Sequence, residues 1–153
     1  MKKLFFLIIL LLLPSISFGA GGSGDNNNNL YKAAKKLILK AKKLEEKNKS
    51  EKALKLYSKA YDKLTKAYDK DKKNADILNY LGYTLRKTGN LEKAENYYLE
   101  GLKLDAGHLG INEYLGELYV QTNRMNLAKE RLEVLYGCKC EEYEELKELI
   151  EKK

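Results

Sequence analysis

The amino-acid sequence predicts an all-α fold, and three features of its 153 residues lead to that prediction. Lys, Glu, Leu, Ala and Tyr dominate, whereas there is one Pro and no Trp, a composition that favours helix over sheet. Apolar residues recur three and four positions apart along most of the chain, as on one face of a helix. A block of residues also recurs after 34 positions, which is typical of stacked helix hairpins. We expect an α-solenoid of antiparallel hairpins, with about three repeats and a C-terminal capping helix.

The first 19 residues are typical of a secretory signal peptide. Two lysines precede an apolar run at 4–13, and Ser17 and Gly19 supply the small residues of a cleavage site. An uncleaved membrane anchor is the alternative, but this run is far shorter than the roughly 20 residues that span a bilayer. No Cys lies near the cleavage site, so a lipid anchor is not predicted. We expect the mature protein in the periplasm of a bacterium or secreted from it.

Residues 20–29 lack apolar periodicity and are rich in Gly and Asn, which predicts a flexible linker. Charge is divided unevenly beyond the signal. Residues 20–74 hold sixteen basic and seven acidic residues, a net charge of +9, whereas residues 75–153 hold eleven and fifteen, a net charge of −4. The mature chain therefore has a basic front and an acidic rear.

The internal repeat is clearest where Asn79-Tyr80-Leu81-Gly82 recurs as Glu113-Tyr114-Leu115-Gly116. In the first copy, the spacing predicts helices over 76–87 and 91–104, separated at Gly89, a residue that ends helices at little cost. In the second copy, it predicts helices over 111–121 and 126–136. We therefore assign repeats to 75–107 and 108–137, and expect Gly82 to permit close helix packing.

The two ends of the repeat array are expected to be less regular. Residues 30–74 predict a divergent first hairpin, with helices over 30–44 and 51–70, the second lengthened by about two turns. Residues 138–153 predict a capping helix, since a solenoid otherwise exposes the apolar side of its last repeat.

These residues resemble the tetratricopeptide repeat family. The resemblance rests on Leu78, Leu81-Gly82, Ala94, Tyr98 and Gly101 in the first copy. The second copy keeps Leu115, Gly116, Tyr119 and Ala128 but departs from the family pattern at Asn112 and Leu135. Residues 75–143 also resemble a group of small exported bacterial members, which implies no particular biochemical role. The family resemblance implies a right-handed superhelix whose first helices line a concave groove for a peptide or helix of a partner protein.

The resemblance also implies which residues face that groove. Asn79 and Arg86 would hydrogen-bond a peptide, and Tyr83 would stack on it. The alternative is that all these positions are solvated faces of amphipathic helices. The full set is Asp76, Asn79, Tyr83, Arg86 and Lys87 in the first copy and Glu113, Glu117, Val120 and Gln121 in the second.

Cys138 and Cys140 are the only cysteines. In an exported protein they favour a disulfide that fixes the turn before the capping helix. A redox role is an alternative, because a thiolate at Cys140 would be favoured near a helix N-terminus. Two thiolates without further ligands do not predict a metal site.

No phosphate loop, nucleophile–base pair or cofactor motif is present, so we predict neither enzymatic activity nor a cofactor. A second hypothesis is that the Lys-rich front binds anionic lipid, cell-wall polymer or, less readily, nucleic acid, although it contains no Arg to pair with phosphate. A solvated Lys face is the plainer interpretation. Salt-dependent association of the basic front with the acidic rear of another copy is a further option.

Overall fold

The computed structural model describes residues 23–153, so the predicted signal peptide at 1–19 lies outside the described part of the chain. These residues form seven α-helices and no strand. The helices are α1 (Ser23–Glu45), α2 (Ser50–Tyr68), α3 (Ala75–Lys87), α4 (Leu91–Leu104), α5 (Leu109–Gln121), α6 (Met125–Leu135) and α7 (Glu141–Glu151).

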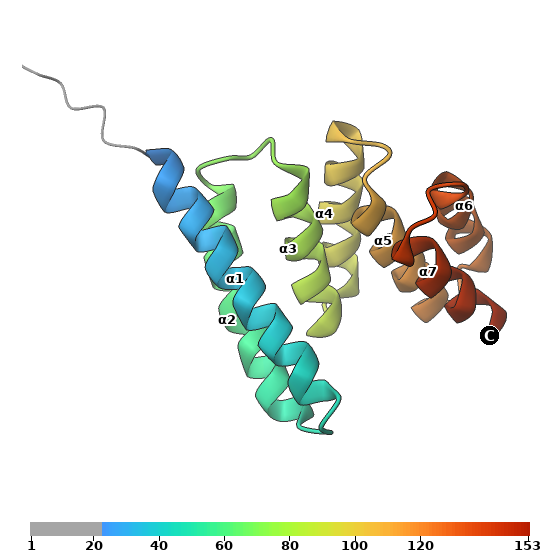
Figure 1. Cartoon of the computed structure of the whole chain (residues 1–153), viewed down its shortest axis with the longest axis horizontal. Coiled ribbons are helices and arrows are strands. Elements are labelled where there is room, and N and C mark those ends of the chain that lie inside the picture. Colours follow the sequence, from blue (N-terminus) through green and yellow to red (C-terminus); the bar gives the residue numbers. More distant parts are fainter. Residues whose placement is uncertain (1–22) are drawn as a thin grey trace, which may run out of the picture.

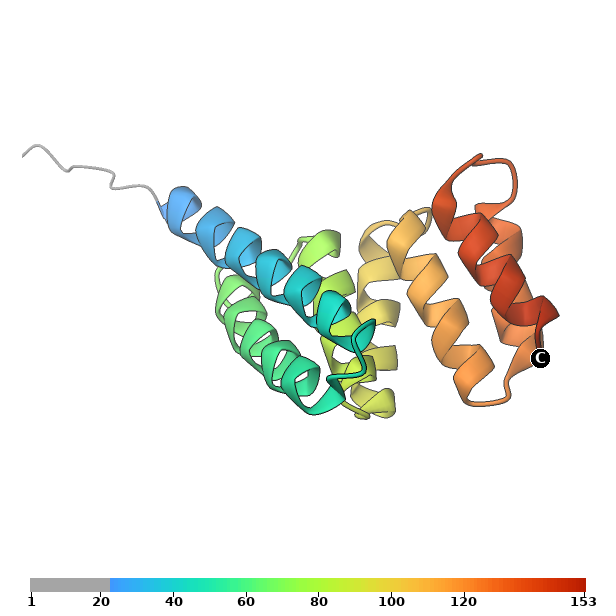
Figure 2. The ribbon, with the colours of Figure 1, turned by 60° about the horizontal axis from the view of Figure 1, so that its bottom comes forward.

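The helices pair as three antiparallel hairpins, α1/α2, α3/α4 and α5/α6, stacked side by side with α7 closing the row (Figures 1 and 2). The first helices also contact one another in sequence, α1 with α3, α3 with α5, and α5 with α7. The predicted fold class, an α-solenoid of helix hairpins with a terminal capping helix, is therefore confirmed.

Local signals position the helix ends. The Asn74 side chain accepts a hydrogen bond of 3.2 Å from the Ile77 backbone N–H, which satisfies a free donor at the start of α3. Gly89, between α3 and α4, has a φ of +88°, and Asn123, 34 residues later, has a φ of +59°. Both residue types enter the left-handed region more readily than others, so the two repeats turn at the same position.

Gly82 of α3 lies directly beneath the side chain of Tyr98 on α4. A Cβ atom added there would lie 2.4 Å from the ring of Tyr98, which is fully buried. Only a residue without a side chain fits beneath this ring, as the sequence predicts for this position.

The prediction of a flexible linker is wrong for residues 23–29, because α1 begins at Ser23 rather than at Leu30. Asn27 and Asn28 line a hollow together with Tyr31 and residues of the connection between α2 and α3. The helix therefore begins within a Gly- and Asn-rich segment whose own helix propensity is poor.

The core runs continuously beneath the hairpins. One buried cluster joins α1, α2 and α3 around Tyr57 and Leu64, and a second joins α3 to α6 around Tyr98 and Leu115. Within residues 23–153, no helix combines the length and the apolar character that crossing a membrane requires.

Candidate partner-binding site

A row of tyrosines lies along the first helices and crosses the boundaries between repeats. The tyrosine row consists of Tyr31 on α1, Tyr80 and Tyr83 on α3, and Tyr114 on α5. The ring centroids of Tyr31 and Tyr80 are 5.8 Å apart, and those of Tyr83 and Tyr114 are 4.8 Å apart. The sequence prediction included only Tyr83, although Tyr80 and Tyr114 occupy the same position in the two repeats.

Three cations lie over this tyrosine row. Lys35 Nζ is 5.4 Å from the Tyr80 centroid, Lys42 Nζ is 5.2 Å from that of Tyr83, and the Arg86 guanidinium is 5.6 Å from the same ring. These distances suit cation–π attraction. Lys35 and Lys42 of the basic front therefore belong to the surface formed by the first helices of the hairpins, here called the first-helix face. The other lysines of the basic front are exposed, namely Lys32, Lys36, Lys40, Lys43, Lys47 and Lys49.

Several residues predicted to meet a partner instead connect neighbouring repeats. Arg86 Nη2 pairs with Glu117 Oε2 at 2.6 Å across α3 and α5, and Lys87 Nζ pairs with Glu45 Oε1 at 2.9 Å across α3 and α1. Tyr83 is only 4% exposed and packs against Tyr57 and Tyr114 in the core. These residues position the face rather than offer free polar groups.

Asn79 and Glu113 occupy the same position in successive repeats, and both are buried, with 5% and 3% of their surface exposed. No donor among the described residues hydrogen-bonds to Asn79 Oδ1. Burial, a hydrogen bond with Glu145 and repulsion from neighbouring carboxylates raise the pKa of Glu113 to about 9. Glu113 is therefore largely protonated at neutral pH.

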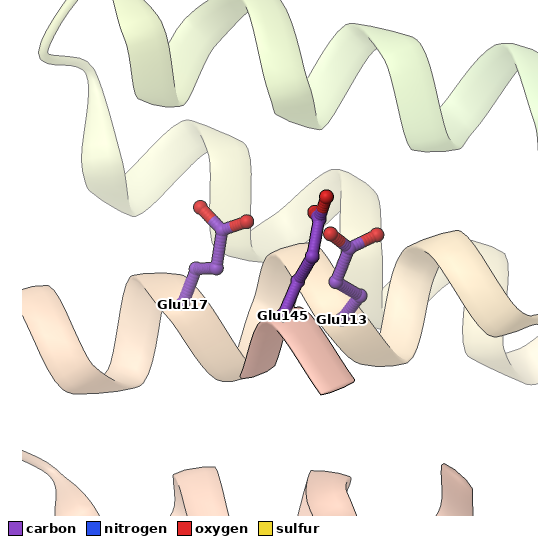
Figure 3. A group of neighbouring side chains, drawn as sticks. All are labelled: Glu113, Glu117 and Glu145. Atoms are coloured by element: carbon purple, nitrogen blue, oxygen red, sulfur yellow. The ribbon is translucent and has the colours of Figure 1, made fainter. Parts of the chain in front are cut away.

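Glu113, Glu117 and Glu145 form an acidic cluster in which one oxygen of each carboxylate lies within 4.8 Å of the others. Figure 3 shows Glu145, from α7, beside the two glutamates of α5. Glu145 lies near the start of α7, where negative charge is favourable, and the packing of α7 against α5 brings it to Glu113. The three carboxylates are close enough to share a cation, although we predicted no metal site.

The face is hollowed where α3, α5 and α7 meet. The larger depression, here called the α3–α5 hollow, encloses about 390 Å³, and a smaller one of about 160 Å³ adjoins it and includes Lys42. Both are walled by Glu113, Tyr114 and Glu142. Of the remaining predicted residues, Asn79 and Asp76 line the hollow, Val120 is buried, and Gln121 is exposed.

The two cysteines lie in the turn between α6 and α7. Their Sγ atoms are 1.95 Å apart, so the structure pairs Cys138 with Cys140 in a disulfide across Lys139, which has a φ of +52°. Cys140 is the residue immediately before α7. The disulfide thus fixes the connection from which α7 turns back onto α5.

Several solved structures share this fold. The type III secretion translocator chaperone SycD of Yersinia enterocolitica has a TM-score of 0.64 at 17% identity, covering 86% of this chain and 92% of that chain. SycD in complex with a peptide of the translocator YopD gives 0.61 at 19% identity, covering 85% and 90%. The second TPR domain of human RPAP3, in complex with an HSP70 peptide, gives 0.54 at 19% identity, covering 83% and 99%. No curated protein matches the sequence.

The fold and the first-helix face together define a class of protein, the helical-repeat solenoid. The family model of the tetratricopeptide repeat matches residues 37–106, which include most of α1/α2 and all of α3/α4. Residues 37–106 therefore match the tetratricopeptide repeat family, and this match extends into the hairpin that the sequence predicts to be divergent.

Proposed function

We propose that the protein is a non-enzymatic scaffold of the bacterial cell envelope that holds a peptide or helix of a partner protein against its first helices. The α3–α5 hollow carries this proposal, because it combines half-buried tyrosine rings with a buried amide oxygen that no described residue satisfies. Aromatic surface contributes much of the binding energy at protein interfaces, and an unpaired acceptor favours a ligand that supplies a donor.

The comparisons support a peptide as the partner. SycD and the RPAP3 domain are both described with a bound peptide, and their fold is shared by this chain. The envelope location rests on the signal peptide predicted over residues 1–19, and mass spectrometry of the mature N-terminus would test it. An intact Met1 in the exported protein would contradict cleavage.

A matched pair of tyrosine variants tests the proposed face. Tyr80→Ala with Tyr114→Ala removes the rings that wall the hollow, whereas Tyr61→Ala with Tyr97→Ala removes two half-buried tyrosines from the second helices. We expect cross-linked partners to be recovered with the wild type and the control variant, but not with the Tyr80/Tyr114 variant. An unchanged set of partners with all three proteins would place the binding surface elsewhere.

The Lys-rich front supports a second candidate function, binding to an anionic surface. The six exposed lysines of α1 and the α1–α2 turn lie beyond the tyrosine row. Attraction of this kind weakens as salt rises, because dissolved ions screen exposed charges. Binding to vesicles of anionic lipid that is absent, or unaffected by salt, would dismiss this candidate.

A further inference from the structure

The chemistry of the α3–α5 hollow indicates what kind of residue it receives. We propose that the hollow is a pocket for the side chain of a Lys or Arg in a basic segment of the partner. This inference rests on the proposed peptide-binding function and adds the charge of the peptide to it.

The walls of the two adjoining hollows hold a surplus of carboxylates. Glu141, Glu142 and Glu145 contribute from the first turns of α7, and Asp76 lies across from them at the start of α3. Among the described residues that line the two hollows, Lys42 is the one lysine or arginine. A cation entering the hollow would therefore relieve repulsion, whereas an anion would add to it.

The buried amide of Asn79 points to a ligand that donates hydrogen bonds. Its Oδ1 finds no donor among the described residues, and it lines the same wall as Glu113. Gly110 leaves room for this amide, since a Cβ there would lie 2.8 Å from Asn79 Nδ2. An ammonium or guanidinium group offers only donors, so it can satisfy the amide oxygen and the carboxylates together.

The aromatic wall suits an organic cation as well. Tyr80 and Tyr114 line the hollow, and the chain already places its own cations over these rings. Lys35 Nζ is 5.4 Å from the Tyr80 centroid, and Lys42 Nζ is 5.8 Å from that of Tyr114. A partner's Lys or Arg would meet the hollow in the way that the protein's own lysines meet the tyrosine row.

A divalent metal fits the same carboxylates less well. Glu117 is already paired with Arg86 at 2.6 Å, and Glu113 would have to lose its proton before it could act as a ligand. Of the three clustered glutamates, Glu113 alone lines the hollow of about 390 Å³, whose volume is that of a ligand pocket.

Phage display tests the proposal. A library of random peptides is panned against the chain from residue 20 onward. We expect the selected peptides to share a Lys or Arg at one position. Glu142→Gln with Glu145→Gln should weaken a selected peptide about tenfold or more, the effect of losing a charge-assisted hydrogen bond. Glu130→Gln with Glu133→Gln on α6 removes the same charge from two exposed positions and should leave binding unchanged.

Thermal unfolding of each variant shows whether α7 remains folded. Asp76→Asn tests the contribution to the hollow of a carboxylate on α3 instead of α7. Selected peptides without a shared basic residue would overturn the pocket but leave the peptide scaffold intact. If no peptide is selected, both proposals fail. Calorimetry of the peptide-free protein with Ca²⁺ tests a metal site instead. If Ca²⁺ binds and Glu145→Gln abolishes this binding, the pocket is overturned in favour of a metal site.

Discussion

The two regular repeats each have a glycine at the same position, Gly82 and Gly116, but fill the space above it differently. In α3/α4, Gly82 lies beneath Tyr98 of the same hairpin. In α5/α6, the equivalent Gly116 meets Leu146 of α7, which would lie 2.4 Å from an added Cβ. The inner repeat therefore fills this space from its own second helix, whereas the last repeat depends on the cap.

This difference explains why the cap also shapes the candidate site. Leu146 is fully buried over Gly116, and this packing holds the first turn of α7 against α5. Glu142 and Glu145 reach Glu113 only because α7 is anchored in this way. Solenoid caps commonly shield an apolar flank. Here the cap additionally supplies Glu141, Glu142 and Glu145, three of the six residues that line the smaller hollow.

The dependence of the last repeat on α7 gives the largest expected effect. Leu146→Ala should lower the free energy of unfolding by about 2–5 kcal/mol, because it leaves a cavity over Gly116. Leu99→Ala, at an α4 position that is 40% exposed, should cost far less and serves as the control. Chemical denaturation measures both variants. Equal losses would show that α7 adds nothing to the last repeat.

Placing a methyl group at each glycine compares the two repeats directly. Gly82→Ala should destabilise by about 1–3 kcal/mol, because the Tyr98 ring is rigid and fully enclosed. Gly116→Ala should cost less, since the branched end of Leu146 can rotate away. Thermal unfolding measures both, and Tyr98→Leu should restore the stability of Gly82→Ala. Failure of this rescue would contradict the steric explanation.

The buried carboxyl of Glu113 predicts that stability depends on pH. Its pKa is about 9 in the folded chain against an ordinary value of 4.5, so the folded state holds the proton more tightly. The resulting stabilisation is complete below about pH 4.5 and is lost as pH rises toward 9, by at most about 1.4 kcal/mol per unit.

Glu113→Gln keeps the shape of the side chain and its ability to hydrogen-bond, but has no titrating proton. The denaturation midpoint of this variant should therefore fall less steeply between pH 6 and 9 than that of the wild type. Glu130→Gln, at an exposed position on α6, is the control. Identical pH profiles for Glu113→Gln and the wild type would contradict a buried, protonated Glu113.

The disulfide predicts the smallest effect. Because it closes a loop of only three residues, reduction should cost no more than about 1–2 kcal/mol. Thermal unfolding with and without reductant measures this, and Cys138→Ser with Cys140→Ser should match the reduced protein. Two free thiols in unreduced protein from an oxidising compartment would contradict the bond, and a reduction that abolishes folding would contradict its minor role.

Much of the fold was predictable because its signals are local. The 34-residue period, the turn at Gly89 with its counterpart Asn123, and the small residue at Gly82 each act on their immediate neighbours. The start of α1 was missed because residues 23–29 are rich in Asn and Gly, whose helix propensity is poor, and carry no apolar periodicity.

The sequence by itself determined that hairpins form, how many there are, and where each turns, since helix formation depends on residues three and four apart. Only the tertiary structure decided that Arg86 is paired with Glu117, that Tyr83 is buried, and that Glu145 joins Glu113. Those outcomes depend on how neighbouring hairpins stack and on how α7 packs against α5. The spacing of charges along a single helix specifies neither the stacking of the hairpins nor the packing of α7 against α5.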